Sequence, residues 1–435
     1  MTNDLDDSQD PVVELKAWLA DNWDPDITVG EWWQRLGLAG WSAPSLPVHA
    51  YGRGLSANDS VRVQDTIASF GALPAPGGLG LLLAAPTIAA FGTPEQIELY
   101  VKAIVTGQQA WCQLFSEPGA GSDLAGLQTR AERDGDEWII TGQKVWTSGG
   151  HFADMAMLLS RTDPDVPKHQ GITYFAFTMR QGDAVEVRPL REITGHAMFN
   201  EVFITEARVR DDARIGELNH GWAVANATLG FERSGLGAGG GHASVSVAIP
   251  GTVGGDLEKR VGDFVDREVG GAVPLQMGST ADLLIKLARD TGRIEDPIVR
   301  QDLMRLHTIS EIGRYGSLRA KAAYASGRDI PGLPNIAKLS MSAIARLNRE
   351  IALGLMGPYG TLHAYDEEAA ATLDAFTGKP LYRELTEMAL HSPGPSIYGG
   401  TDQVQRNIIG ERILGLPKEP GNEKTMPFRD LPKNG

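Results

Sequence analysis

The sequence predicts an α+β multidomain protein, in which a middle β-barrel or β-sandwich domain lies between an N-terminal helical domain and a C-terminal helical bundle. Two observations predict this class. The chain has 435 residues, of which 42% are hydrophobic, so it is long enough to bury several cores. Its apolar residues follow a helical period at both ends but form short β-rich runs between residues 108 and 219. We therefore expect domains at residues 1–107, 108–219 and 220–435.

The first domain has apolar residues at helical spacings, interrupted by Gly and Pro clusters. Its longest uncharged stretch, residues 71–92, raises the question of a membrane span. Pro74, Pro76 and Pro86 fall within it, and proline interrupts helical hydrogen bonding. We therefore expect a buried helix and loop there, with no insertion into a membrane.

The middle domain contains short runs rich in β-branched and aromatic residues. Asp134-Gly135 lies just before one of them and is typical of a β-hairpin turn. The expected strands span residues 137–146, 155–160, 172–179, 185–190 and 199–209.

The C-terminal domain returns to a helical period. Asp296-Pro297 is a helix start signal, an N-cap followed by proline at the first helical position. Residues 244–280 are rich in Gly and Val, so we interpret them as an insertion or a poorly ordered connection. The tail from Pro417 onward looks extended and polar. One expected helix face holds Val299, Leu303, Leu306 and Ile309, and a second helix has a stripe of Ile336, Leu339, Ala343, Leu347, Ile351 and Leu355.

The composition argues against several classes of function. The formal charge of −15 disfavours a general affinity for nucleic acid or anionic membranes, because the long-range field repels both. Cys112 is the single cysteine, so an internal disulfide and a multi-thiolate metal site are excluded. The histidines show no metal-ligand spacing, so we expect no metal. Met1 precedes an acidic, polar stretch rather than a targeting peptide, which predicts a cytoplasmic protein.

The most specific signature is Phe115-Ser116-Glu117-Pro118-Gly119-Ala120-Gly121-Ser122-Asp123. Its small residues let backbone N–H groups approach a ligand closely, although such a run can equally be a tight turn. It is not a P-loop, because no Gly-Lys-Ser/Thr follows, and the spacing does not fit a dinucleotide fingerprint. A second segment, Trp146-Thr147-Ser148-Gly149-Gly150, offers an indole face and hydroxyls to a flat aromatic cofactor. The alternative is a buried core tryptophan followed by a turn.

In this order and spacing, the two segments resemble the FAD-contacting strands of the acyl-CoA dehydrogenase family. The resemblance extends from the helical N-terminal region to Ile413-Leu414-Gly415-Leu416. It implies FAD as the cofactor and an acyl-CoA as the substrate. It also implies that Phe115, Ser116 and Ser122 line the flavin or the pyrophosphate arm of the acyl-CoA. Trp146 and Ser148 would lie beside the isoalloxazine.

The family reaction removes a proton α to a thioester, so it needs a general base and a polarised carbonyl. Many members place the basic glutamate at the position of Gly399, where this chain has no side chain. Members that resemble isovaleryl- and long-chain acyl-CoA dehydrogenases place it on a helix of the C-terminal domain, directly before an arginine. Glu232-Arg233 matches that pattern. The resemblance therefore implies Glu232 as the base, Arg233 near the CoA chain, and the backbone N–H of Gly399 as a donor to the thioester carbonyl.

Two simpler interpretations stay open at this stage. Glu232 could form a surface ion pair on its helix, since Glu-Arg is a common dipeptide. Arg233 could be paired inside the core. Leu229, Phe231 and Leu236 flank the dipeptide and favour a buried, closely packed site.

Further positions follow from the resemblance alone. Gly400, Thr401 and Gln403 resemble the segment over the flavin and adenine, where Gly400 would also contact substrate. Arg300-Gln301 resembles the position that reaches the FAD of a neighbouring subunit. Gly357 belongs to a partly matching Gly-rich segment. Where the family has an Arg-x-x-Phe-Gly segment, this chain has Gly292-Arg293-Ile294, which leaves FAD retention open.

The resemblance implies FAD-dependent α,β-dehydrogenation of an acyl-CoA to a trans-2-enoyl-CoA, with electrons passed to an electron-transfer flavoprotein. A homodimer or homotetramer is expected. One alternative is a non-catalytic or FAD-deficient partner subunit that assembles with a paralogue, and another is a relative with a different flavin reaction. Because a glycine stands at position 399, we expect branched, long or sterol-derived acyl chains to be preferred over butyryl-CoA.

Overall fold

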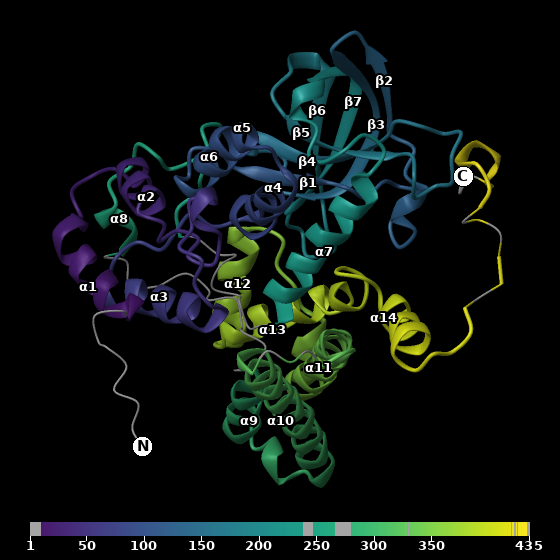
Figure 1. Ribbon diagram of the computed structural model, residues 1–435. Helices are drawn as coiled ribbons and strands as arrows, with labels where there is room; N and C mark the ends of the chain where they lie inside the picture. Colours follow the sequence, from purple (N-terminus) through teal and green to yellow (C-terminus); the bar gives the residue numbers. More distant parts are fainter. Residues whose placement is uncertain are drawn as a thin grey trace. The chain divides into compact units, whose positions relative to one another are not determined.

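The computed structural model describes residues 10–432 except 238–246, 266–279, 327, 329, 419, 422 and 424 (Figure 1). The chain divides into two compact units. Unit 1 contains Met1–Leu190, Ala197–Glu268 and Gly421–Gly435, and unit 2 contains Arg191–His196 and Val269–Pro420. The fold class is confirmed, with helices on either side of a β region in the sequence. The three domain boundaries stay predictions.

The N-terminal part of unit 1 is helical, as predicted. Its tryptophans form the centre of a core: Trp32 and Trp33 are fully buried, and their indole N–H groups donate to the carbonyls of Leu73 (2.7 Å) and Pro74 (2.8 Å). Within the described residues, no helix is long and apolar enough to cross a membrane. The elements are α1 (Pro11–Asn22), α2 (Val29–Leu38), α3 (Ala57–Phe70), η3 (Gly80–Ala84), α4 (Ala85–Phe91), α5 (Pro94–Gln96), η4 (Ile97–Val101) and α6 (Lys102–Val105).

The β region forms one seven-stranded sheet in the order β1-β4-β2-β3-β7-β6, with β5 paired to β4. β2 meets β4 at a single register pair, Arg130 with Arg161, so the sheet curls at this point. All five predicted strands are confirmed, as is the hairpin turn, where Gly135 has a φ of +67°. β1 and β2 were not among the expected ranges. The strands are β1 (Trp111–Leu114), β2 (Arg130–Asp134), β3 (Glu137–Ser148), β4 (Met155–Arg161), β5 (Ile172–Thr178), β6 (Val185–Leu190) and β7 (Phe199–Arg210).

Two segments that follow the sheet in sequence also belong to unit 1, namely α7 (Gly221–Gly237) and residues 247–265, which include α8 (Gly262–Val265). The amide of Val29 donates to Lys259 (2.9 Å), the amide of Gly30 donates to Leu257 (2.9 Å), and Val261 is fully buried in the tryptophan core. Of the two interpretations of 244–280, the poorly ordered connection is therefore wrong for its described part, and the insertion stays a prediction. Its apolar residues complete the core around α1 and α2, a long-range pairing that local periodicity does not reveal. Residues 266–279 lie outside the described part of the chain.

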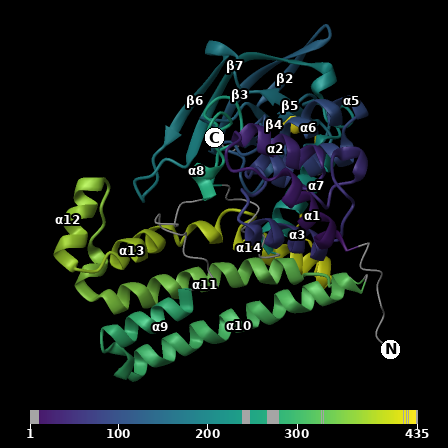
Figure 2. The same ribbon diagram turned by 90° about the vertical axis from the view of Figure 1, so that its left-hand side faces the viewer.

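Unit 2 is a helical bundle in which the long helices α10 and α11 pack side by side (Figure 2). The predicted start of α10 is confirmed, because Asp296 Oδ1 accepts from the amide of Ile298 (2.9 Å). The predicted stripe of α11 is wrong at Ile336, which is 52% exposed. The helices are α9 (Thr280–Asp290), α10 (Pro297–Ala325), α11 (Leu333–Met356), α12 (Glu367–Thr377), α13 (Leu381–His391) and α14 (Asp402–Ile408).

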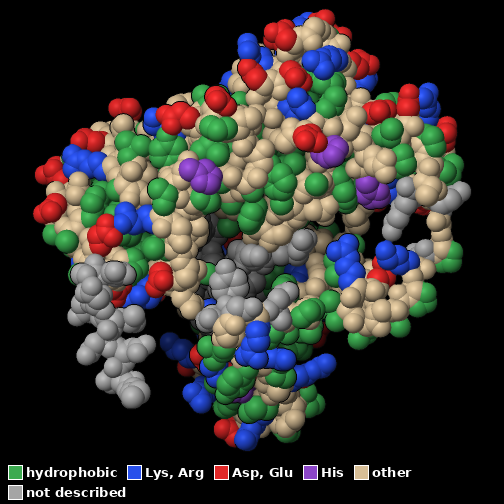
Figure 3. Space-filling model, in the orientation of Figure 1, with side chains coloured by type: hydrophobic (Ala, Val, Ile, Leu, Met, Phe, Trp, Pro, Cys, Tyr) green, Lys and Arg blue, Asp and Glu red, His purple; other side chains and the backbone are tan. Residues whose placement is uncertain are grey.

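The surface of unit 1 carries charges of both signs. On the face drawn in Figure 3, acidic and basic side chains over the sheet and the N-terminal helices are interspersed. The net negative charge is therefore not gathered into one large acidic area on this face.

Candidate active site

The run of residues 115–123 forms a loop in unit 1, called the signature loop below. A buried ion pair on its core side holds this loop. The Glu117 carboxylate, 8% exposed, accepts from the amides of Gln128 (2.6 Å) and Thr129 (2.9 Å) and from Lys144 Nζ (2.9 Å). Lys144 is fully buried and also donates to the Phe115 carbonyl (3.1 Å). Burial alone would raise the pKa of the Glu117 carboxyl. The Lys144 charge and the hydrogen bonds outweigh burial and hold this pKa below its ordinary value.

The pair holds the start of the signature run at Phe115 and Glu117, and the chain beyond it at Gln128 and Thr129. Glu117 and Ala120 exchange backbone hydrogen bonds of 3.1 and 3.0 Å, so the run is a tight turn. Ser122 beyond it is exposed, and Ser116 is partly buried. The Phe115 ring is only 4% exposed and lies edge-on to Tyr174, with 5.9 Å between ring centroids. Phe115 therefore supports the loop from the core side, and Ser122 is the side chain that faces outward.

A β-bulge in β3 presents Trp146 to solvent. Trp138, Ile140 and Lys144 are buried on one face of the strand, and that alternation would also bury Trp146. Between Lys144 and Thr147 the register with β7 shifts, and Trp146 takes a left-handed φ of +63°. Its indole is 58% exposed. A bulky residue in this backbone region is uncommon and clusters at functional sites. The alternative of a buried core tryptophan is thus excluded.

The neighbours of Trp146 keep the bulge in place. Asn200 Nδ2 donates to the Thr147 carbonyl (3.0 Å), and the Trp146 ring meets the Phe199 ring edge-on at 5.8 Å. Ser148 is exposed next to them. The exposed indole and hydroxyl fit a flat aromatic group with polar edges.

Helix α7 carries Glu232 and packs tightly on the sheet. A Cβ on Gly221 would lie 2.6 Å from the backbone of Thr173, so the start of the helix approaches β5 as closely as glycine allows. One turn before Glu232, the buried Thr228 hydroxyl lies 2.9 Å from that of Thr87. Phe231 packs against the same core that buries Phe115 and Tyr174.

Glu232 itself is partly buried at the edge of that core. Its helix therefore brings it to the same hydrophobic cluster as the signature loop, through Phe231. The backbone of Arg233 continues α7, but its side chain lies outside the described part of the structure. The expected contact of Arg233 with the CoA chain stays a prediction.

The glycine turn in unit 2 precedes α14. Gly399 and Gly400 have φ values of +62° and +82°, which favour glycine. Thr401 caps the helix, because its Oγ1 accepts from the amide of Val404 (3.1 Å). The Gln403 side chain is exposed one turn along. Gln405 is 1% exposed and donates back to the Gly399 carbonyl (3.0 Å).

The remaining predicted cofactor residues lie elsewhere in unit 2. Arg300 and Gln301 are exposed near the start of α10, and Gly357 is exposed directly after α11 with a φ of +58°. Arg293 donates to the Gly354 carbonyl (3.3 Å), which places the start of α10 beside the end of α11. The glycine turn is tied through Gln405 to Asn335 at the start of α11, and Asp402 after it pairs with Arg346 in the middle of that helix. One copy of unit 2 does not bring these two sets together.

Buried cations beside the signature loop were missed from the sequence. Arg161, 4% exposed, donates to the carbonyls of Ala125 (2.7 Å) and Lys168 (2.6 Å). Burial lowers the pKa of Arg161 to about 10. Lys168 Nζ lies 2.9 Å from the Asp123 carboxylate, so both cations hold the stretch that follows Ser122.

The C-terminal segment covers these cations, so the tail from Pro417 onward is not uniformly extended. The Phe428 ring stacks at 3.7 Å on the Arg161 guanidinium, and Glu423 pairs with Lys168 at 3.0 Å. The amide of Phe428 also donates to the Val166 carbonyl (2.9 Å). Figure 1 shows this end of the chain beside the sheet. One of the buried cations could have been predicted from the sequence. Lys144 lies an even number of residues from Trp138 and Ile140 on the predicted strand, so it should share their buried face and need an acidic partner.

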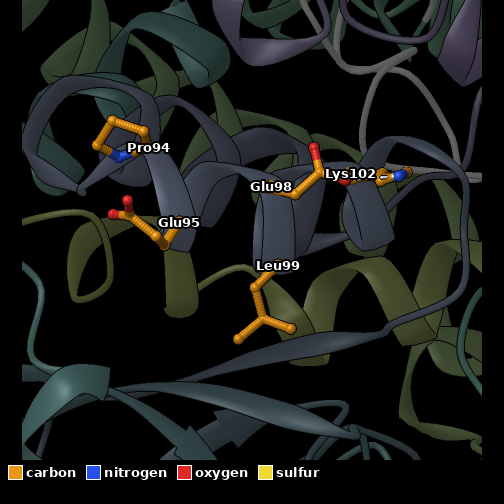
Figure 4. Close-up of a pocket in the computed structure, with 5 residues that line it drawn as sticks. All are labelled: Pro94, Glu95, Glu98, Leu99 and Lys102. Carbon is orange, nitrogen blue, oxygen red and sulfur yellow. Dashed lines mark hydrogen bonds and ion pairs between the residues drawn. The ribbon is translucent and has the colours of Figure 1, made fainter.

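A separate surface pocket holds none of these residues. Figure 4 shows that Pro94, Glu95, Glu98, Leu99 and Lys102 line it. Lys102 and Glu98 form an ion pair of 2.6 Å one helical turn apart, with both side chains largely exposed. We assign no ligand to this pocket.

Comparison with known proteins identifies the family. The acyl-CoA dehydrogenase N-terminal, middle and C-terminal domains match residues 13–108, 112–207 and 270–414. Acyl-CoA dehydrogenase IpdE1 of Mycobacterium tuberculosis is 33% identical over 95% of this chain and 99% of its own length. Acyl-CoA dehydrogenase FadE34 of the same organism is 35% identical over 88% of this chain and 46% of its own length.

Solved structures agree with this assignment. The Tcur3481-Tcur3483 steroid ACAD has a TM-score of 0.68 at 26% identity, covering 94% of this chain and 97% of that one. The ChsE4-ChsE5 complex from Mycobacterium tuberculosis has a TM-score of 0.66 at 25% identity, covering 96% and 100%. The chain therefore belongs to the acyl-CoA dehydrogenase family of oxidoreductases, as its sequence motifs indicate.

Proposed function

We propose that this chain catalyses the α,β-dehydrogenation of an acyl-CoA thioester, with Glu232 as the base and FAD as the cofactor. The observation that carries the proposal is the position of Glu232. It lies partly buried on α7, beside the core under the signature loop, in a chain whose position 399 is glycine. A positioned carboxylate is a suitable general base for removing a proton from a carbon beside a thioester.

The residues present fit a flavin. FAD, when bound, accepts a hydride from the β carbon of the substrate. Trp146 offers its exposed face, while Ser122 and Ser148 offer exposed hydroxyls in the same unit. In unit 2, Thr401, Gln403 and Gly357 would hold the cofactor, and Arg300 and Gln301 would reach the FAD of a neighbouring subunit.

The chain itself supplies proton transfer and charge stabilisation. Glu232 removes the proton from the α carbon, and negative charge develops on the thioester oxygen. The backbone N–H of Gly399 donates to that oxygen, a role that needs no side chain. We expect the electrons to leave to an electron-transfer flavoprotein.

Relatives support a bulky substrate. A steroid ACAD shares the fold at 26% identity, and position 399 lacks the side chain that other members place there. We therefore propose a sterol-derived or branched acyl-CoA. Anaerobic titration of the purified protein with straight, branched and sterol-derived thioesters tests this, since the visible absorbance of the flavin bleaches when a substrate reduces it. A clear preference for butyryl-CoA contradicts the substrate class.

The base is tested by Glu232→Gln. Loss of a positioned base is expected to slow flavin reduction by about 10²–10⁴-fold, with the fold and flavin content retained. Stopped-flow bleaching measures this rate. Glu217→Gln is the matched control, because the Glu217 side chain is 84% exposed at the approach to α7. An unchanged reduction rate in the Glu232 variant removes this residue from the mechanism.

A second candidate is a subunit that works only with a paralogue. The two similar structures above are named as pairs, Tcur3481-Tcur3483 and ChsE4-ChsE5. The separation of Gly357 from the glycine turn along α11 also favours a site completed by another subunit. Flavin content and molar mass of the chain purified alone, and then with co-expressed paralogues, distinguish the two. Flavin that appears only in the mixed assembly supports the second candidate.

A further inference from the structure

One face of α11 holds the segment that carries the glycine turn. Asn335, Lys338, Ser342 and Arg346 follow one another at spacings of three or four residues, so they share a face of the helix. Their partners all lie between residues 395 and 405. Asn335 donates to Gln405 Oε1 (2.7 Å), Lys338 and Ser342 donate to the Pro395 carbonyl, and Arg346 pairs with Asp402 (3.2 Å).

Gln405 is the member that touches the turn. It is 1% exposed, and its Nε2 lies 3.0 Å from the Gly399 carbonyl and 3.4 Å from the Gly400 carbonyl. In a planar trans peptide the N–H points opposite to the C=O. Holding the Gly399 carbonyl toward Gln405 therefore turns the N–H of Gly400 away from it. Holding the Gly400 carbonyl turns the N–H of Thr401 away in the same manner.

The amides of the glycine turn have no acceptor within the described residues. No hydrogen bond from the N–H of Gly399, Gly400 or Thr401 occurs in that part of the chain. Backbone donors in folded proteins are nearly always paired with protein, solvent or a ligand. Consecutive free donors at a glycine turn are the groups that an acyl carbonyl requires.

We infer that Gln405, held by Asn335, is a positioning residue that aims the amides of Gly400 and Thr401, which follow the Gly399 amide, at the thioester carbonyl. This rests on the proposed function. Glutamine suits the place, because it must donate to two carbonyls and accept from Asn335 at once. Glutamate would set a carboxylate against the carbonyl oxygens. A Cβ on Gly400 would lie 2.7 Å from Gln405 Nε2, so the turn and the glutamine are matched.

The test compares a thioester with a thioether that lacks the carbonyl. Equilibrium binding of one acyl-CoA and of the corresponding S-alkyl-CoA is measured by calorimetry on the Glu232→Gln protein, where no turnover interferes. Adding Gln405→Leu is expected to weaken thioester binding about tenfold, the loss of one hydrogen bond, and to change thioether binding less than about twofold.

Asn335→Leu provides the second variant, because it removes the support of Gln405 and leaves the turn itself untouched. A smaller loss of the same kind is expected, and the double variant should lose no more than Gln405→Leu alone. Asn407→Leu, at an exposed position of α14, is the control. Thermal melting of each variant verifies folding.

The outcomes separate the two ideas. Equal weakening of thioester and thioether, or no weakening in either variant, overturns the positioning role of Gln405. The Glu232→Gln protein with Gln405 intact tests the proposed function itself. If it binds the thioester no better than the thioether, the contact with the thioester carbonyl is overturned. In the otherwise unchanged enzyme, a raised KM for the thioester with little change in flavin content agrees with the inference.

Discussion

The two loops with proposed ligand contacts are held by different chemistry. In unit 1, the signature loop depends on charges, with Glu117 paired to Lys144 and Asp123 to Lys168. In unit 2, a neutral amide holds the carbonyls of the glycine turn, through Gln405 and Asn335, while the ion pair of Arg346 with Asp402 holds the residue that follows the turn. A buried charge without its partner is far more costly than a lost neutral hydrogen bond. The signature loop is therefore coupled to folding, and the glycine turn is coupled mainly to geometry.

The largest effect is expected from removing the buried ion pair of the signature loop. Lys144→Met leaves the Glu117 carboxylate buried without a cation, so the free energy of unfolding should fall by about 3–5 kcal/mol. Urea denaturation monitored by circular dichroism measures it. Lys102→Met is the matched control, because its pair with Glu98 is exposed and should contribute at most about 1 kcal/mol. Equal stability of the two variants contradicts the proposed dependence on charge.

Acid sensitivity should follow from the same pair. Because the pKa of Glu117 is lowered in the folded state, its carboxylate stabilises the fold above the unfolded pKa of about 4.5. That contribution is lost as the pH falls through the lower, folded pKa. A Glu117→Gln protein should therefore show a weaker loss of stability below pH ~4.5 than the unaltered chain.

A smaller effect is expected from the C-terminal segment. Phe428→Ala uncovers the Arg161 guanidinium, and losing a partly buried cation–π contact should lower the free energy of unfolding by about 1–2 kcal/mol. Faster proteolysis after Ser122 would show that the loop itself has loosened. Phe376→Ala is the control, since that ring is 71% exposed. If both variants behave alike, the C-terminal segment does not support the loop.

The smallest effect on stability is expected at Trp146. This residue tests whether a side chain proposed to contact the flavin can change flavin binding without changing stability. Trp146→Gly relieves a left-handed backbone but loses the contact with Phe199, so the free energy of unfolding should change by less than about 1 kcal/mol. Flavin content, measured by absorbance, should nevertheless fall. Trp146→Ala keeps the strained backbone and should be less stable than the glycine variant by about 1 kcal/mol. The reverse order would mean that the bulge carries no strain.

Local patterns predicted much of the fold. Short runs rich in β-branched and aromatic residues located β3–β7, and Asp296-Pro297 located the start of α10, because both signals depend on neighbours a few residues apart. The same patterns failed at Ile336, which is half exposed, and in residues 247–265, whose apolar residues fill a core more than two hundred positions earlier in the chain. Periodicity identifies a buried face, but not what buries it.

The sequence by itself determined the fold class, the family and the identity of the candidate base, since these depend on the order of short motifs and on the glycine at position 399. Tertiary structure alone decided how those motifs are held. The bulge that turns Trp146 outward, the partner of Lys144 and the support of the glycine turn by Gln405 and Asn335 all depend on which distant segments meet. Such pairings are set by packing of the whole chain, because a buried polar group is stable only where another part of the fold satisfies it.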